Sequence, residues 1–286
     1  MKIIYLGAGY CSEFLTPLIQ DKAEIIGIHS QNPFKIKFKD FRNIQRFTFQ
    51  DFLYLKEKIL KDTTHILVSI PPDNRGDIAF RHLKKLLENK NSIQWFGYFS
   101  TTGVYGDHGG KWVNELSELR TKNKRSLNRI LAEDQYLGLY KNYNLPVHIF
   151  RLPGIYGPTR SVIGRIKKNE MKLIETKKHF FSRVFVTDIA QAIYSSMKNI
   201  TPGEVYNITD DYPCSAFEVA SYAYQILRIP KPPIINLNDN SINEMTRSFY
   251  KENKRVSNKK IKQKLKWYPR IKDYKQGLNE ILNKKL

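Results

Sequence analysis

The 286-residue sequence has only two cysteines, Cys11 and Cys214, and no long run of apolar residues. Two cysteines are too few for a disulfide framework, which indicates a reduced, cytoplasmic protein. The longest apolar stretches, such as HILVSIPP, are far shorter than the roughly 20 residues that a membrane-spanning helix needs. The first apolar run begins at once, without a separate basic segment and cleavage site, so we expect neither a signal peptide nor membrane insertion.

Acidic residues are also few: 27 aspartates and glutamates stand against 48 lysines and arginines, which gives a formal net charge of +21. A basic surface can bind nucleic acid because lysines that neutralise phosphates release counterions. The lysines are nevertheless dispersed from Lys35 to Lys285, and the sequence contains no zinc-ligand spacing, aromatic RNA-binding signature or basic helix with heptads. We interpret the charge as a compositional bias and do not expect nucleic acid to be the main partner.

The order of the apolar segments indicates the fold. With 41% apolar and 13% aromatic residues, the chain can form an ordinary globular core. Strand-like and helix-like runs alternate in the first half, at residues 2–9, 12–21, 23–30, 44–49, 52–60, 64–70, 79–90, 93–100, 125–143 and 146–152. Such alternation predicts βαβ units and a parallel sheet with helices on both faces. The carboxyl ends of the strands then share one edge, where ligands bind.

The predicted fold class is α/β: a Rossmann-like doubly wound parallel sheet with a smaller, interleaved C-terminal part that binds substrate. After Gly157 the regular alternation breaks, and the chain ends in helical patterns. We therefore assign residues 1–157 to a NAD(P)-binding domain, to which residues 184–209 return. Residues 158–183 and 210–286 are assigned to the smaller part.

The stretch GAGYCS connects the first predicted strand to its helix. In a dinucleotide-binding turn, Gly7 would permit the tight bend, and Gly9 would let the backbone approach a pyrophosphate at the helix N-terminus. Ser12 stands where a third glycine is usual, and as a small N-capping residue it could hold a backbone N–H or the phosphate itself. With Tyr10 and Cys11 between them, these residues predict a cofactor site. Cys11 has no paired histidine or second cysteine, so we interpret its side chain as a packing residue.

The end of the second predicted strand bears on the choice of cofactor. A site that prefers NAD usually ends this strand with Asp or Glu, which holds the ribose 2′-hydroxyl. This sequence offers other residues there: His29, Ser30, Lys35 and Lys37. No carboxylate would repel a 2′-phosphate and cations lie near, so the sequence predicts NADP, with NAD as the alternative. The other interpretation is that His29 and the lysines are merely exposed.

Five stretches occur in the order found in one family: GAGYCS, VSIPP, FSTTGVYG, FRLPGIYGP and RVFVTDIAQAI, followed by the C-terminal KRVSNKKIKQKLKWYPRIKDYKQGL. Over nearly its whole length the chain thus resembles the extended short-chain dehydrogenase/reductases of the NAD-dependent epimerase/dehydratase family. It is most similar to the atypical branch that keeps the glycine turn but lacks the family's tyrosine–lysine pair. The resemblance implies a NAD(P)-binding oxidoreductase or epimerase-like protein that acts on a small polar or nucleotide-sugar-type substrate.

The resemblance also assigns roles to individual residues. It places four of them around the cofactor: Ser69, Pro71, Pro153 and Ile155. Arg183 of the segment RVFVTD would meet an anionic substrate. Asp188 ends the same segment, and we interpret it as a helix N-cap rather than as a catalytic residue.

The stretch YFSTTGVYG ends a predicted strand at the expected catalytic edge. By its spacing from VYG, Thr101 matches the Ser/Thr that hydrogen-bonds the reacting oxygen in the family, with Ser100 beside it. A fixed hydroxyl donor suits this place because a carbonyl that gains a hydride becomes an alkoxide, which the donor stabilises.

The family's proton-transferring tyrosine, followed four residues later by a lysine, is missing from this sequence. Arg125 and Arg129 occupy the corresponding positions. Arg129 could replace the lysine's contact with the ribose, whereas the pKa of Arg125 is too high for proton exchange near neutrality. Tyr105 is the nearest substitute, although tyrosines at this position in the family commonly pack or line the cofactor pocket. His108 could relay protons or be an exposed loop histidine.

Three functions agree with these observations. The first is a NAD(P)-dependent oxidoreductase or epimerase/dehydratase-like enzyme in which Thr101, Tyr105 or a substrate group handles the proton. The second is a non-catalytic NADP-binding sensor or scaffold, and the third is a basic nucleic-acid-associated protein on a Rossmann scaffold. No metal site is predicted. The long helical stretch at 125–143 is a candidate surface for a homodimer.

Overall fold

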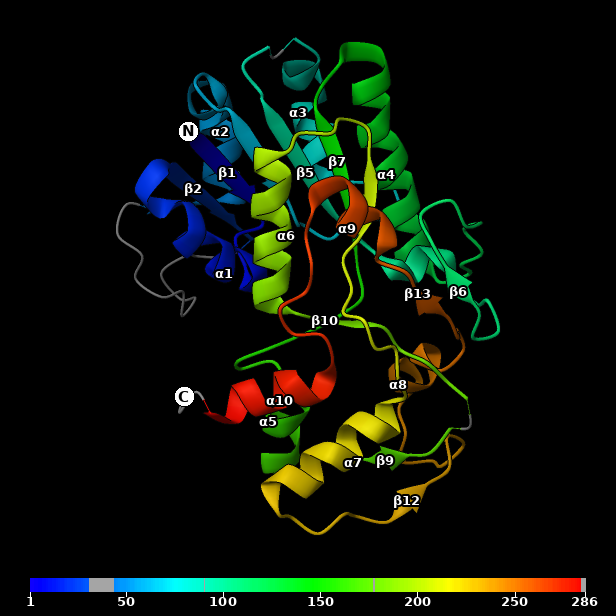
Figure 1. Cartoon of the computed structure of the whole chain (residues 1–286). Helices are drawn as coiled ribbons and strands as arrows, with labels where there is room; N and C mark the ends of the chain where they lie inside the picture. Colours follow the sequence, from blue (N-terminus) through cyan, green and yellow to red (C-terminus); the bar gives the residue numbers. More distant parts are fainter. Residues whose placement is uncertain (31–43, 90, 177, 284–286) are drawn as a thin grey trace.

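A seven-stranded parallel sheet forms the centre of the larger lobe in the computed structural model, which describes residues 1–30, 44–89, 91–176 and 178–283 (Figure 1). The strands follow the order β11-β7-β5-β4-β1-β2-β3. Their bounds are β1 (Lys2–Leu6), β2 (Glu24–His29), β3 (Ile44–Thr48), β4 (His65–Val68), β5 (Trp95–Thr101), β7 (Val147–Leu152) and β11 (Val205–Asn207). Every neighbouring pair is parallel, so the predicted doubly wound fold is confirmed.

Helices cover both faces of this sheet (Figure 1). One face packs against α1 (Tyr10–Ile19), α6 (Val186–Lys198) and α9 (Lys259–Leu265), and the other against α2 (Phe49–Leu60), α3 (Ile78–Glu88) and α4 (Lys124–Tyr143). A short 3-10 turn, η1 (Gln20–Lys22), follows α1. Because both faces are covered, most side chains of the central strands are buried and apolar, and a ligand would meet polar groups at the strand ends.

Side-chain caps start three of these helices. Thr48 accepts the N–H of Asp51 at the start of α2, and Asp77 accepts that of Phe80 at the start of α3. Asn123 accepts the N–H of Arg125 at the start of α4. Each cap satisfies a donor that has no partner inside its helix, so the sequence fixes where these helices begin.

The smaller lobe lies below the carboxyl edge of the sheet (Figure 1). Its core is formed by α5 (Val162–Lys167), α7 (Ala216–Leu227) and α10 (Tyr274–Asn283). It also contains α8 (Glu244–Phe249) and the pair β9 (Leu173–Ile174) and β12 (Ile234–Ile235). At the junction, β8 (Gly154–Tyr156) pairs with β10 (Arg183–Phe185).

The helix α9 departs from the predicted division of the chain. It lies within residues 210–286, which we assigned to the smaller part. Its buried side chains Ile261 and Leu265 instead belong to the core of the sheet, together with residues of α1 and α6. The predicted boundary fails there because the apolar face of α9 covers the end of the sheet beside β11.

The chain's last third also returns to the end of β5. The strand β13 (Arg255–Val256) pairs with β6 (Trp112–Val113), which follows the turn η3 (Thr102–Tyr105). Val104, Tyr105, Val113 and Val256 form a small buried cluster beneath this pair. The residues just before β13 therefore lie beside the loop that follows β5.

The described ranges contain neither a membrane-spanning helix nor a cluster of metal-binding side chains. No helix in them is both long and apolar enough to cross a membrane. The same ranges contain no group of three or more His, Cys, Asp or Glu side chains that could hold a metal ion.

Candidate active site

The glycine turn between β1 and α1 has a conformation that its residues impose. Gly7 has a φ of +99°, in the left-handed region that favours glycine. A Cβ at Gly7 would also lie 2.6 Å from Ser69 Oγ, and that hydroxyl donates to the Gly7 carbonyl at 2.6 Å. Pro71 is exposed two residues further on. The loops after β1 and β4, which both carry predicted cofactor residues, are therefore in direct contact.

Ser12 closes the turn on itself. Its Oγ accepts the Gly9 N–H at 2.9 Å and donates to the Gly9 carbonyl at 2.7 Å, and the side chain is buried. Of the two roles predicted for Ser12, the structure shows the first, because the hydroxyl satisfies a backbone N–H. The same bonds keep this hydroxyl from a phosphate.

The space beside Gly9 fits a phosphate group. Gly9 is exposed, and a Cβ built there would have only the Gly7 carbonyl oxygen, at 4.0 Å, beside it. Within the described part of the chain, the N–H groups of Tyr10 and Cys11 have no hydrogen-bond acceptor. Open space, two unused donors and the positive end of the α1 dipole suit a pyrophosphate.

The side chains of Tyr10 and Cys11 face away from this space. The Tyr10 hydroxyl donates to the Pro158 carbonyl at 2.6 Å, and the guanidinium of Arg160 lies 5.8 Å from the centre of its ring. Cys11 packs against the core, and burial raises the pKa of its thiol to about 12. The structure therefore places the Cys11 side chain as the packing residue we predicted, and contacts of both residues with a cofactor would be made by their backbone N–H groups.

The end of β2 differs from the prediction. His29 is 3% exposed, and burial together with the charge of Arg46 on β3 lowers its pKa. A neutral, buried imidazole offers no cation to a 2′-phosphate, and the interpretation of His29 as an exposed side chain is also wrong. Ser30 is exposed at the strand end, and Lys35 and Lys37 lie outside the described residues.

Two of the three predicted catalytic residues belong to a buried polar network. Ser100 Oγ donates to Glu133, whose carboxylate is paired with Arg151 at 2.7 Å. Arg151 donates to the Tyr105 hydroxyl at 3.1 Å, and Tyr105 donates to Asn207 at 2.8 Å. Burial raises the pKa of Tyr105 to about 12. Both hydroxyls are buried and engaged, which opposes the predicted catalytic roles of Ser100 and Tyr105.

Thr101 is the predicted hydroxyl that remains accessible. It ends β5, is half-buried, and its Oγ1 accepts the Gly103 N–H at 3.1 Å. That bond uses a lone pair of the oxygen, so the hydroxyl proton is left for donation. Thr101 can therefore still donate a hydrogen bond, as stabilisation of a reacting oxygen requires.

Three basic residues were predicted near the reacting centre, and the structure gives each a different place. Arg129 turns back onto the sheet, where its Nη1 donates to the Phe99 carbonyl. Arg125 is exposed on the first turn of α4. His108 is half-buried, with a ring nitrogen 3.2 Å from the Glu118 carbonyl oxygen. A ribose contact by Arg129 would have to use its other nitrogens.

The loop that joins β7 to β8 lies against the glycine turn. Pro153 is half-buried, and Ile155 pairs with Val184 of β10 while packing on the core. A Cβ at Gly157 would lie 2.6 Å from the Tyr10 hydroxyl. The predicted nicotinamide-facing loop is therefore next to the predicted pyrophosphate turn, as a single dinucleotide site would require.

Arg183 does not present a free guanidinium to an anionic substrate. Its Nη1 donates to the carbonyls of Phe181 and Cys214 at 2.9 and 3.0 Å, and its Nη2 donates to the Ser215 carbonyl at 3.4 Å. It also lies near the buried carboxyl of Asp210, whose pKa burial raises well above the usual value. These contacts make Arg183 a link between β10 and the chain before α7.

Asp188 is not the N-cap of its helix, because Phe185 precedes the first turn of α6 and Asp188 lies within that turn. The buried Asp188 carboxylate instead accepts the N–H groups of Arg270 and Ile271 at 2.9 and 3.0 Å. Asp188 therefore accepts backbone N–H groups, as a capping residue does, but these belong to a segment more than 80 residues away rather than to its own helix. This contact fastens the chain before α10 to the larger lobe.

Replacing Asp188 with Asn should lower the free energy of unfolding by about 1–3 kcal/mol, because one buried acceptor is replaced by an amide that faces an N–H donor. Burial raises the pKa of Asp188 from 3.8 to about 6. The native state thus binds the proton more tightly, so the stability that Asp188 contributes is complete below about pH 4 and falls as pH rises through 6. Urea unfolding at pH 5 and 7 should show a smaller difference in the free energy of unfolding between wild type and variant at pH 7.

Asp134→Asn, at an exposed position of α4, is the control for Asp188→Asn, and an equal effect of the two variants on stability would contradict the role assigned to Asp188.

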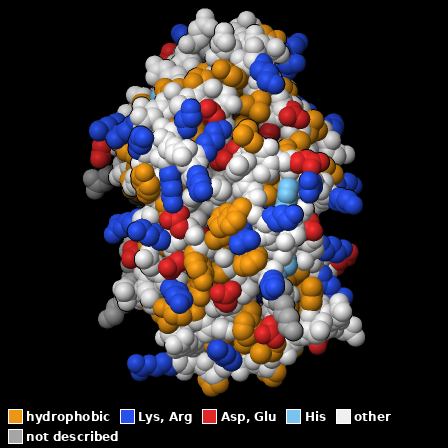
Figure 2. Space-filling view, turned by 45° about the vertical axis from the view of Figure 1, so that its right-hand side comes forward, with side chains coloured by type: hydrophobic (Ala, Val, Ile, Leu, Met, Phe, Trp, Pro, Cys, Tyr) orange, Lys and Arg blue, Asp and Glu red, His pale blue; other side chains and the backbone are white. Residues whose placement is uncertain are grey.

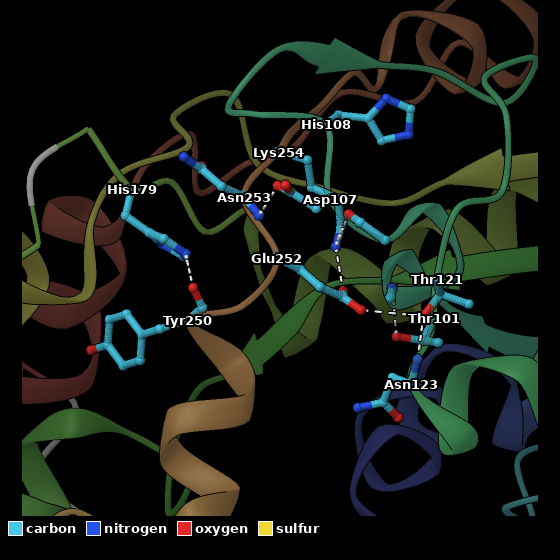
Figure 3. Close-up of polar contacts among 12 residues, drawn as sticks. Thr101, Asp107, His108, Thr121, Asn123, His179, Tyr250, Glu252, Asn253 and Lys254 are labelled. Atoms are coloured by element: carbon cyan, nitrogen blue, oxygen red, sulfur yellow. Dashed lines mark hydrogen bonds and ion pairs between the residues drawn. The ribbon is translucent and has the colours of Figure 1, made fainter. Parts of the chain in front are cut away.

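The segment before β13 contributes residues that the sequence did not reveal. Lys254 Nζ donates to the Gly106 carbonyl and to Glu252, both at 2.9 Å, and Glu252 accepts the Thr121 hydroxyl at 3.2 Å (Figure 3). Their stretch, ENKRV, follows α8 far along the chain from the catalytic edge. No local pattern signals a contact between residues 148 positions apart, such as Lys254 and Gly106.

The sheet, the glycine turn and the hydroxyl at its edge define a dinucleotide-binding α/β protein of the Rossmann type. The profile of the NAD-dependent epimerase/dehydratase family matches residues 79–209. Over this segment, somewhat less than half of its length, the chain is similar to members of that family.

Individual known proteins show the same relationship. The chain is 25% identical to dTDP-D-glucose 4,6-dehydratase of Bos taurus over 173 residues. This aligned region covers 58% of this chain and 44% of that protein. It spans about half the length of the curated relatives it matches.

Two solved structures extend the comparison to the whole chain. A functionally unknown conserved protein from Silicibacter pomeroyi is 34% identical, with a TM-score of 0.91 over 99% of this chain and 98% of that one. dTDP-glucose 4,6-dehydratase from Bacillus anthracis, solved in complex with NAD, is 23% identical, with a TM-score of 0.81 over 99% of this chain and 95% of that one. The second similarity supports the fold.

Proposed function

We propose that the chain is a NAD(P)-dependent enzyme that oxidises or reduces a hydroxyl-bearing carbon of a nucleotide-sugar-type substrate. One observation carries the proposal: a glycine turn open at Gly9 and a strand that ends in the accessible hydroxyl of Thr101 lie at the same edge of the sheet. The family, and the relatedness to dTDP-D-glucose 4,6-dehydratase, support both the cofactor and the class of substrate.

Each part of the site has a distinct task in this proposal. The Gly9 side of the turn and the N–H groups of Tyr10 and Cys11 hold the pyrophosphate, and Ser69 fixes the turn from the neighbouring loop. A bound nicotinamide supplies the place where a hydrogen and two electrons are taken up or given back. Thr101 donates to the substrate oxygen as negative charge develops on it.

The preference for NADP over NAD is part of the proposal. The end of β2 carries no carboxylate among its described residues, and Ser30 is exposed there. Arg46 on β3 pairs in register with Gly27 of β2, two residues before the strand end, and burial together with its charge lowers the pKa of His29 at that end. A hydroxyl and a cation at this edge favour a ribose 2′-phosphate, whereas a carboxylate would favour the 2′-hydroxyl.

Fluorescence titration with NADPH and NADH at fixed salt tests the cofactor, and we expect saturable binding of both with tighter binding of NADPH. Thr101→Val should leave these affinities unchanged. It should lower the rate of nicotinamide reduction with dTDP-glucose by about 100-fold, because a donor to the developing charge is lost. If neither nucleotide binds, the proposal fails. If the variant turns over like the wild type, Thr101 has no catalytic role.

A non-catalytic NADP-binding sensor is the second candidate, and one observation favours it. Arg125, which we predicted to occupy the position of the family's proton-transferring tyrosine, is exposed on α4. Turnover of any carbonyl or alcohol substrate would decide against a sensor. The face displayed in Figure 2 gives no support to a nucleic-acid-binding protein, since its lysine and arginine side chains are interspersed with acidic ones.

The proposed assembly is a homodimer formed through α4. Leu127 and Leu131 are exposed on this helix, 47% and 40% respectively. Spaced four residues apart, they lie on one face, as a helix that packs against a second helix requires.

A further inference from the structure

A pair of oppositely charged side chains lies at the entry to α4. Lys254 Nζ is 2.9 Å from Glu252 and 2.9 Å from the Gly106 carbonyl oxygen. Glu252 Oε1 accepts the Thr121 hydroxyl at 3.2 Å, and Thr121 Oγ1 accepts the N–H of Asn123, the N-cap of α4, at 3.1 Å. The pair thus connects the loop after β5 to the first turn of α4 (Figure 3).

These two elements flank the proposed reacting position. A Cβ at Gly103 would lie 3.3 Å from Thr101 Oγ1 and 2.6 Å from Ser126 Oγ, so the Thr101 hydroxyl is close to the first turn of α4. That turn also carries Arg125, the residue predicted from the resemblance to stand in place of the family's tyrosine. The carboxylate of Glu252, on the C-terminal segment, contacts Thr121, two residues before the N-cap of α4.

Glu252 is the carboxylate of this region best suited to exchange a proton with a substrate. Glu133 is buried in its ion pair, and Glu115 holds the Asn207 N–H at 2.8 Å. Asp107 accepts two backbone N–H groups, and this lowers its pKa. The side chain of Glu252 is 22% exposed, and its bonds with Thr121 and Lys254 leave lone pairs on both oxygens.

We infer that Glu252 takes the place of the absent tyrosine as the proton-exchanging group, that Lys254 is its positioning residue, and that the substrate is the sugar hydroxyl of a nucleoside diphosphate sugar. The inference rests on the proposed function. In the oxidising direction the substrate O–H bond breaks, and its proton passes to the Glu252 carboxylate. The carbon loses a hydrogen with two electrons to the oxidised nicotinamide, so the alcohol becomes a carbonyl and the nicotinamide is reduced.

Other titratable groups lie around the pair and bear on its pH dependence. Lys254 itself faces Glu252, Asp107 and His108 belong to the loop after β5, and His179 packs beside Tyr250 (Figure 3). Lys254 also influences Asp107 and His179 electrostatically. A pH profile of the reaction must therefore be compared between variants.

The kinetic test uses the full chain loaded with NADP⁺, and in parallel with NAD⁺, and mixed with dTDP-glucose and UDP-glucose as probes. Glu252→Gln should lower the single-turnover rate of nicotinamide reduction about 100-fold or more and abolish the fall in rate at acidic pH. Lys254→Met should shift the pH profile without flattening it, because the carboxylate remains. Glu118→Gln is the matched control, since it makes the same change at an exposed glutamate paired with Arg120.

A binding test is independent of turnover. Calorimetry with dTDP-glucose and the NADPH-loaded protein should show about 10-fold weaker binding for Glu252→Gln, because a neutral amide replaces a charged acceptor. Glu118→Gln should bind like the wild type. Nucleotide affinity should be unchanged in all variants, and the thermal unfolding of Glu118→Gln should match that of the wild type.

The outcomes separate this inference from the proposed function. A Glu252→Gln variant that reacts at the wild-type rate would overturn the inference. So would a wild-type chain that binds the nucleotide but neither binds nor oxidises the two sugar nucleotides, and in that case the cofactor site would stand. A wild-type chain that binds no nucleotide would overturn the proposed function, and this inference with it.

Discussion

Replacing Glu133 with Gln is expected to lower the free energy of unfolding by about 3–5 kcal/mol, because the buried guanidinium of Arg151 loses its counter-charge. The two side chains are 3% and 6% exposed and are joined by bonds of 2.7 and 3.1 Å. Glu133 also accepts the Ser100 hydroxyl, and Arg151 donates to Tyr105, so the loss spreads to the end of β5. Urea denaturation followed by circular dichroism measures it.

Two further variants make this expectation specific. Glu118→Gln breaks an exposed ion pair with Arg120 of similar length, 2.8 Å, and should cost less than about 1 kcal/mol. The double variant Glu133→Leu with Arg151→Met removes both buried charges and should recover much of the lost stability, as is found when buried pairs become apolar. Equal effects of Glu133→Gln and Glu118→Gln would show that the buried pair is not a stabilising contact.

Replacing Gly9 with Asp should weaken nucleotide binding at least 100-fold while leaving the protein folded. Gly9 has a φ of −140°, which any residue adopts, and a Cβ there meets open space, so the substitution strains nothing. The new carboxylate would occupy the space proposed for the pyrophosphate and repel it at a few ångströms, where like charges cost several kcal/mol in a poorly screened site. Fluorescence titration with NADPH measures the effect.

Gly164→Asp is the matched control for this prediction. Gly164 is also exposed near a helix N-terminus, that of α5, and a Cβ there meets no atom within 4 Å. The same added charge should leave nucleotide affinity unchanged. Retained binding in Gly9→Asp, with both proteins folded, would count against the glycine turn as the cofactor site.

The sequence predicted those parts of the molecule that local patterns encode. The parallel sheet follows from apolar runs separated by capped helices, and the turn at Gly7 follows from a conformation that favours glycine. The accessible Thr101 hydroxyl follows from a strand that ends in polar residues. In each case the deciding interaction joins residues near one another in the chain.

The sequence could not predict which polar groups are used up by remote partners. The sequence suggested catalytic roles for the hydroxyls of Tyr105 and Ser100, but in the structure they donate hydrogen bonds to Asn207 and Glu133. Arg183 looks like an anion-binding residue until carbonyls of a distant segment surround it. Such contacts join residues that are far apart in the chain, so no local sequence pattern predicts them.

The pairing of β13 with β6 has a consequence for how the protein forms during synthesis. The residues of the glycine turn itself belong to the early segments around β1, β2 and β4, which emerge first from the ribosome. The Glu252–Lys254 side of the site joins residues more than 130 positions apart and cannot assemble until nearly the whole chain is available. During synthesis, the residues that bind the nucleotide should therefore be present well before the residues that surround the substrate.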